Sequence, residues 1–250
     1  AAAVMEGAGE PVLALGPGQD PHEIALRPSE RRRLAEADLV LWIGPALELP
    51  LADILADDDP RLLTVQAIGG LELLPAGNTV DPHLWLHLGN AQKIAQALAA
   101  RLSTLDPANA ARYADNQARF SQSLAALRAA TQDKLAATPL RAWVVYHHAF
   151  RYVEQELGLP PPFALTDSSG NMAGLRSLIA LREELRRADL NCLLAEPGVD
   201  AAKVRNLLDL PALRLQEVDI LGNTETPGME AYARLYLALI DSILACGVSG

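Results

Sequence analysis

Short apolar runs alternate with longer amphipathic stretches in the first part of the chain. The runs at 12–15, 39–43 and 62–65 are predicted to be strands, the first of them buried in a parallel sheet. Between them, 29–37 and 47–56 are predicted to be helices. This β-α-β alternation is typical of an α/β protein with a parallel sheet, in which ligands bind at the carboxyl ends of the strands.

The central part of the chain carries two further helical patterns, at 88–102 and 107–137. The second has no internal glycine or proline over about 30 residues, well above the usual helix length of about 11–12 residues. A helix of that length can join two lobes as a stiff strut. An ordinary long core helix would show the same periodicity, so the pattern leaves both interpretations open.

The β-α alternation resumes after residue 139. Strands are predicted at 142–146, 163–165, 192–195 and 213–219, and helices at 149–157, 173–188, 199–209 and 231–245. We therefore predict an α/β fold of two lobes, each with a central parallel β-sheet flanked by helices and joined by one long linking α-helix. The expected division is an N-terminal lobe at 1–105, the linking helix at 106–138 and a C-terminal lobe at 139–250.

Composition and charge exclude several classes of protein. The chain has 250 residues, of which 50% are hydrophobic and 21% charged, and its net charge is −10. Nucleic-acid binding is not expected, because it requires clustered Lys and Arg. No apolar run reaches the roughly 18 residues of a membrane span. Cys192 and Cys246 allow either one disulfide or two buried thiols.

The candidate chemistry lies in the five histidines. The tripeptide Asp-Pro-His occurs twice, ending at His22 and His83, and each copy predicts a rigid turn that holds an imidazole at a set angle. His147 follows a predicted strand. Imidazole is the commonest zinc ligand, so these three residues could form a zinc site with a carboxylate such as Asp219 or Glu196.

The remaining patterns argue against an enzyme. His83 and His87 are four residues apart, but Leu84 stands where a zinc protease motif needs glutamate, so His87 is expected on a helix surface. His148 is expected beside the site or at the surface. The chain has no Gly-x-Ser-x-Gly elbow, Walker loop or dinucleotide fingerprint.

Several longer motifs resemble one known family. They are Asp20-Pro21-His22-Glu23, Ala37-Asp38-Leu39-Val40-Leu41-Trp42-Ile43-Gly44-Pro45, Asp81-Pro82-His83-Leu84-Trp85-Leu86, Tyr146-His147-His148-Ala149-Phe150, Leu194-Ala195-Glu196-Pro197 and Val218-Asp219-Ile220-Leu221-Gly222. Over nearly its whole length the chain resembles the solute-binding components of zinc ABC transporters, in the metal-binding cluster A-I family.

The resemblance implies a set of metal ligands: His22, His83, His147 and Asp219. Manganese-binding relatives carry a glutamate where His147 stands, and three imidazoles favour zinc. Glu196 is expected beside the site. The resemblance also implies a Cys192–Cys246 disulfide. Two features depart from the family pattern: 71–80 contains no histidine-rich loop, and 171–174 (Asn-Met-Ala-Gly) replaces the usual proline-glycine helix start.

The function implied is that of a periplasmic receptor, secreted through a signal peptide that this sequence does not contain. It would bind Zn²⁺ between two lobes as a monomer, without catalysis, and deliver it to an ABC transporter membrane permease; a periplasmic metallochaperone is a further candidate partner. The alternatives are a manganese or iron receptor of the same fold, a zinc-dependent hydrolase, because three histidines can leave a position open for water, and an adhesin.

Overall fold

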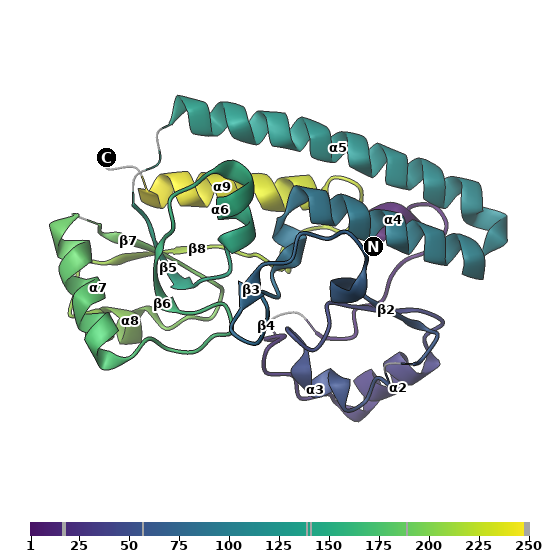
Figure 1. Cartoon of the computed structure of the whole chain (residues 1–250), viewed down its shortest axis with the longest axis horizontal. Helices are drawn as coiled ribbons and strands as arrows, with labels where there is room; N and C mark the ends of the chain where they lie inside the picture. The colour runs from purple at the N-terminus through teal and green to yellow at the C-terminus, as the bar shows by residue number, and fades with distance from the viewer. Residues whose placement is uncertain (17–18, 57, 139, 141, 189, 248–250) are drawn as a thin grey trace. The chain divides into compact units, whose positions relative to one another are not determined.

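The computed structural model describes residues 1–16, 19–56, 58–138, 140, 142–188 and 190–247 (Figure 1). The chain divides into two compact units. Unit 1 consists of Ala1–Ala125 and Thr226–Ala231, and unit 2 of Ala126–Glu225 and Tyr232–Gly250. The predicted lobe boundary at residue 139 falls outside the described residues.

Unit 1 contains a parallel pair of short strands, β1 (Val40–Trp42) and β2 (Leu62–Thr64). Trp42 pairs with Thr64 across the ladder, and its indole Nε1 donates to Thr64 Oγ1 at 2.8 Å. The helices and 3-10 turns of unit 1 that precede the long helix are α1 (Ala2–Met5), α2 (Pro28–Glu36), α3 (Leu49–Ala52), η1 (Val65–Ala67), η2 (Leu84–Leu86), α4 (Leu88–Leu105) and η3 (Pro107–Asn109). One core cluster packs α2, β1, α3 and the turn after α3 together: Leu34, Val40, Trp42, Leu51 and Leu55.

Two expectations for unit 1 were wrong. Val12 and Leu13 are 76% and 70% exposed, and no strand forms at 12–15. The apolar run is short and follows Pro11, which cannot donate to a ladder, so four apolar residues do not suffice to specify a strand. The predicted loop between 67 and 80 contains a small antiparallel hairpin, β3 (Pro75–Ala76) and β4 (Thr79–Val80), which leads directly into the second Asp-Pro-His.

The long helix predicted from the sequence is confirmed as α5 (Ala110–Ala137) (Figure 1). Its residues up to Ala125 belong to unit 1, and those from Ala126 belong to unit 2. Within unit 1, Asn116 is buried and its Nδ2 donates to the carbonyl oxygens of Val4 (3.1 Å) and Glu6 (2.8 Å). Within unit 2, Arg128 pairs with the buried carboxylate of Glu156 at 2.5 Å. Each half of the helix is therefore anchored by polar contacts of its own unit.

Unit 2 is built on a four-stranded parallel sheet in the order β6-β5-β7-β8. Its strands are β5 (Val144–His147), β6 (Phe163–Thr166), β7 (Cys192–Ala195) and β8 (Arg214–Glu217). Its helices after α5 are α6 (Arg151–Leu157), α7 (Leu175–Arg187), α8 (Ala201–Leu208) and α9 (Ala231–Gly247), the last beginning at the end of the unit 1 segment. All four strands lie within or next to the predicted runs, and the α/β prediction is confirmed.

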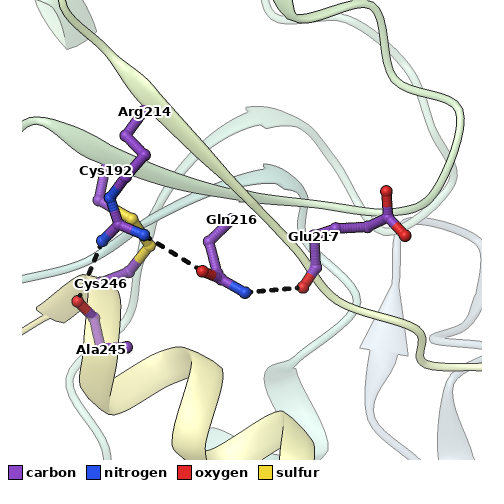
Figure 2. Close-up of a disulfide and its surroundings, with 6 residues drawn as sticks. All are labelled: Cys192, Arg214, Gln216, Glu217, Ala245 and Cys246. Carbon is purple, nitrogen blue, oxygen red and sulfur yellow. Dashed lines mark hydrogen bonds between the residues drawn. A yellow bond between two sulfur atoms is a disulfide. The ribbon is translucent and has the colours of Figure 1, made fainter.

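The predicted disulfide joins Cys192, the first residue of β7, to Cys246 in the last turn of α9, with 5.1 Å between the Cα atoms (Figure 2). That separation is ordinary for a disulfide. Beside it, the Arg214 guanidinium donates to the Ala245 carbonyl (3.3 Å) and to Gln216 Oε1 (3.1 Å). The end of α9 is therefore fastened to both β7 and β8.

A half-buried carboxyl group in unit 1 predicts that stability depends on pH. Glu48 accepts hydrogen bonds from the amides of Ile43 (3.4 Å) and Gly44 (3.0 Å), where β1 ends. Gly44 has φ +129°, and a Cβ there would lie 2.4 Å from the Gln66 side chain. Burial raises the pKa of Glu48 to about 7, although both amide hydrogen bonds act to lower it.

Because the folded-state pKa exceeds the unfolded one, the folded protein holds a proton that the unfolded chain releases between pH 4.5 and 7. Stability is therefore expected to fall as the pH rises through this range, by up to about 3 kcal/mol. Glu48→Gln should remove this dependence and stabilise the protein at pH 8 but not at pH 5, as measured by urea unfolding at both values. Exposed Glu36→Gln is the control; parallel pH profiles for wild type and Glu48→Gln would contradict the expectation.

Candidate metal centre

The two Asp-Pro-His tripeptides of unit 1 share one hydrogen bond from the aspartate side chain to the histidine amide. In the first, the Asp20 Oδ1 atom accepts the amide of His22 at 2.8 Å; in the second, the Asp81 Oδ1 atom accepts the amide of His83 at 3.0 Å. An aspartate that bonds the backbone two residues on forms an Asx-turn, and the central proline stiffens it. Each tripeptide therefore forms a stiff turn just before its histidine, as the sequence predicted.

His83 is more tightly held than His22. Asp81 Oδ1 also lies 2.9 Å from His83 Nδ1, and the two side chains are 0% and 2% exposed. A carboxylate can only accept, so Nδ1 carries the hydrogen and the lone pair lies on Nε2. Metal-binding histidines commonly have such a carboxylate, which fixes the ring orientation and raises the basicity of the ligand. Sequence reasoning treated Asp81 only as part of a turn.

His22 and His83 lie close together in the folded unit. Their ring centroids are 5.7 Å apart at an interplanar angle of 52°, and a ring nitrogen of one lies within 4.8 Å of a ring nitrogen of the other. Two nitrogens bound to one zinc at Zn–N distances of about 2.0–2.1 Å are roughly 3.4 Å apart. A separation of at most 4.8 Å is close to that spacing, so the two imidazoles could share one ion.

Asp81→Asn is expected to weaken zinc binding by about 10–100-fold, the usual effect of removing a carboxylate that supports a metal-binding histidine. The asparagine oxygen can still accept the His83 amide, so the turn is retained. Asp20→Asn is the matched control, because the Asp20 side chain accepts only the amide of His22 among the described residues and does not hold its ring. Competition titration against a chromophoric chelator measures both; equal losses for the two variants would contradict this role of Asp81.

In unit 2, His147 is the last residue of β5, and its Nδ1 lies 2.9 Å from Glu196 Oε1. Glu196 follows β7, and the pairing of Val145 with Leu194 places His147 opposite Glu196 by the sheet register. The side chains are 11% and 22% exposed. This carboxylate–histidine pair has the same arrangement as Asp81–His83 and again leaves Nε2 for a metal.

A second acidic residue lies near His147 on its other side. His147 pairs with Thr166 of β6, and Asp167 follows. Burial acts to raise the pKa of Asp167, but hydrogen bonds from Asn171 and Ser169, together with the charge of His147, outweigh it and leave this pKa lowered. Sequence reasoning missed this residue, because only the strand register places it beside His147.

Asp219 lies two residues beyond β8, at the same carboxyl edge of the sheet as His147, with β7 between their strands. Its Oδ1 atom accepts the amides of Leu221 (3.0 Å) and Gly222 (2.9 Å). Its Oδ2 atom accepts both the amide (2.9 Å) and the hydroxyl (3.1 Å) of Thr224. In this state the carboxylate holds the 220–224 loop, so binding a metal would replace at least one of these hydrogen bonds.

The remaining two histidines have other roles. The predicted helix-surface residue His87 is the N-cap of α4, where its Nδ1 atom accepts the amide of Asn90 at 3.2 Å. It shares no helix with His83, which precedes η2, so the two residues do not form one helical face. His148 Nε2 lies 2.8 Å from Glu154 Oε1, a contact with α6.

Known proteins resemble this chain over nearly its whole length. The family model "Zinc-uptake complex component A periplasmic" matches residues 1–246. The high-affinity zinc uptake system protein ZnuA of Paracoccus denitrificans is 28% identical over 282 residues, covering 97% of this chain and 86% of that protein. The ZnuA protein of Haemophilus ducreyi is 24% identical, covering 98% and 88%.

Solved structures share the fold. The periplasmic zinc binding protein TroA from Treponema pallidum matches with a TM-score of 0.82 at 20% identity, over 99% of this chain and 94% of that one. A zinc-bound deletion mutant of ZnuA matches with a TM-score of 0.80 at 20% identity, over 95% and 89%. No helix in the described part of the chain is long and apolar enough to cross a membrane. Because the family model spans nearly the whole sequence, the chain belongs to the family of periplasmic zinc-uptake complex components, as its motifs predicted.

Proposed function

We propose that this protein captures a zinc ion in the periplasm with His22, His83, His147 and Asp219 and delivers it to the membrane permease of an ABC transporter. The observation that carries the proposal is that carboxylates hold two of the three imidazoles in a fixed orientation. His83 and His147 each have Nδ1 held by a buried or half-buried carboxylate, which directs Nε2 toward a ligand. His22 stands close to His83 in the same unit.

The donor set favours zinc over manganese. Three neutral imidazoles and one carboxylate suit a four-coordinate zinc ion, whereas manganese prefers a site richer in oxygen. Asp219 would join as the fourth ligand by exchanging a loop hydrogen bond for the metal. A fourth protein ligand also closes the position that a hydrolase needs for water, so no catalysis is proposed.

The remaining parts of the proposal concern organisation. We propose that the receptor has two lobes, at 1–105 and 139–250, which a linking helix at 106–138 joins. We also propose that it is a monomer. A periplasmic metallochaperone is a further candidate partner for loading the metal.

The direct test is calorimetric titration of chelator-stripped protein with zinc and then manganese, in the presence of a competing chelator. One zinc per chain, with manganese bound far more weakly, is the expected result. Equal affinity for manganese would favour a manganese receptor of the same fold. Absence of zinc binding would reject the proposal, and zinc-dependent turnover of ester or amide substrates would revive the hydrolase alternative.

A further inference from the structure

An exposed apolar patch lies on unit 2 and has no role in the proposed metal site. It consists of Met172 (47% exposed) and of Leu175 (76%) and Ile179 (48%) on α7, and is called the 172–179 patch below. Leu175 and Ile179 are one helical turn apart and share a face. A different face of α7 packs into the core through Leu178, Leu181 and Leu185. The patch residues therefore do not belong to the core face of α7.

The patch borders the edge of the sheet that carries His147. Met172 forms an isolated antiparallel bridge with Thr166, and Thr166 pairs with His147 across β5 and β6. Leu175 is the first residue of α7, the helix that follows this edge. A cargo ion leaving His147 would therefore leave beside the patch.

The charges around the patch are also unusual. The later arginines of α7 are paired: Arg182 and Arg186 contact both Glu183 and Asp209, and Arg187 contacts Glu184. Arg176, between Leu175 and Ile179, is exposed and makes no hydrogen bond or ion pair with any residue that the structure describes. Arginine is enriched at the centres of interfaces, where it pairs with a partner's carboxylate.

We propose that the 172–179 patch, with Arg176, is the part of unit 2 that docks on the membrane permease. This inference rests on the proposed function, because a delivery surface must border the cargo. The partner surface should present apolar side chains and a carboxylate opposite Arg176. A second copy of the chain fits less well, because a two-fold interface centred on this patch would bring two unpaired Arg176 side chains together.

The test replaces the apolar pair by Leu175→Asp together with Ile179→Asp in the cells that make the protein. Radioactive zinc uptake under zinc limitation should fall about tenfold or more, as for the loss of interface hot spots. The purified variant should bind zinc within about twofold of wild type, because neither side chain is a proposed ligand. Arg176→Glu should also reduce uptake.

Leu207→Asp is the matched control. Leu207 is 45% exposed near the end of α8. The chain then continues to the amino end of β8, away from the carboxyl edge that carries His147, so this variant should transport zinc normally. Normal uptake with the double variant would overturn the proposal, as would sedimentation showing a wild-type dimer that the double variant dissociates. Failure of the proposed function would be distinguishable, because wild-type protein would then fail to bind zinc in the titration.

Discussion

Replacing His147 with alanine is expected to weaken zinc binding by at least about a hundredfold, with the same outcome for His83→Ala and His22→Ala. The reason is that sites of four protein ligands reach about 10–16 kcal/mol of binding free energy, so the loss of one ligand removes several kcal/mol. Removing the His147 imidazole also removes the Nδ1 contact of Glu196, and removing the His83 imidazole removes the Nδ1 contact of Asp81. Competition titration with a chelator of known affinity measures the loss.

The matched control is His148→Gln, which removes the neighbouring imidazole whose contact is with Glu154. It should retain zinc affinity within a fewfold of wild type. Full zinc affinity in His147→Ala would show that the proposed ligand set is wrong. Losses confined to His22→Ala and His83→Ala would instead place the ion in unit 1 alone.

Reduction of the Cys192–Cys246 disulfide is expected to lower the free energy of unfolding by about 4 kcal/mol, because the bond closes a loop between residues 54 positions apart and so limits the entropy of the unfolded chain. Both cysteines are buried, and the bond fastens α9 to β7, one of the two inner strands of the sheet. Urea unfolding with and without a thiol reductant measures the difference.

The double variant Cys192→Ala, Cys246→Ala separates the disulfide from side effects of the reductant, because its stability should not respond to reductant at all. Zinc affinity of the folded reduced protein should stay within a fewfold, since Cys192 begins β7 and Glu196 follows its other end. A stability change below about 1 kcal/mol would show that the disulfide does not constrain the unfolded chain as the entropy model requires.

Unit 2 shows how the sheet register assembles half of the candidate site. His147, Glu196 and Asp219 come from three separate parts of the chain and lie at one edge of the sheet because β5, β7 and β8 are parallel neighbours. Unit 1 positions its two candidate histidines differently, because each follows an Asp-Pro turn. The two arrangements converge on imidazoles with carboxylate support at Nδ1, for His83 and His147.

Much of the fold could be predicted because local pattern and tertiary structure agree. The strand at 192–195 is uniformly apolar and fully buried, and α5 has no internal glycine or proline to end it. The run at 12–15 has the same apolar composition as a strand, yet it lies exposed. A strand needs a neighbour to receive its hydrogen bonds, and composition alone does not supply one.

By itself, the sequence determined the alternation of strands and helices, the long helix and the positions of the candidate ligands, because periodicity and proline turns act over a few residues. Only the tertiary structure decided which carboxylate supports each histidine and that Asp219 holds its own loop. It also decided that the two cysteines meet and that Leu175 and Ile179 stay exposed. Those outcomes depend on strand register and helix packing between residues far apart in the chain, which local pattern does not encode.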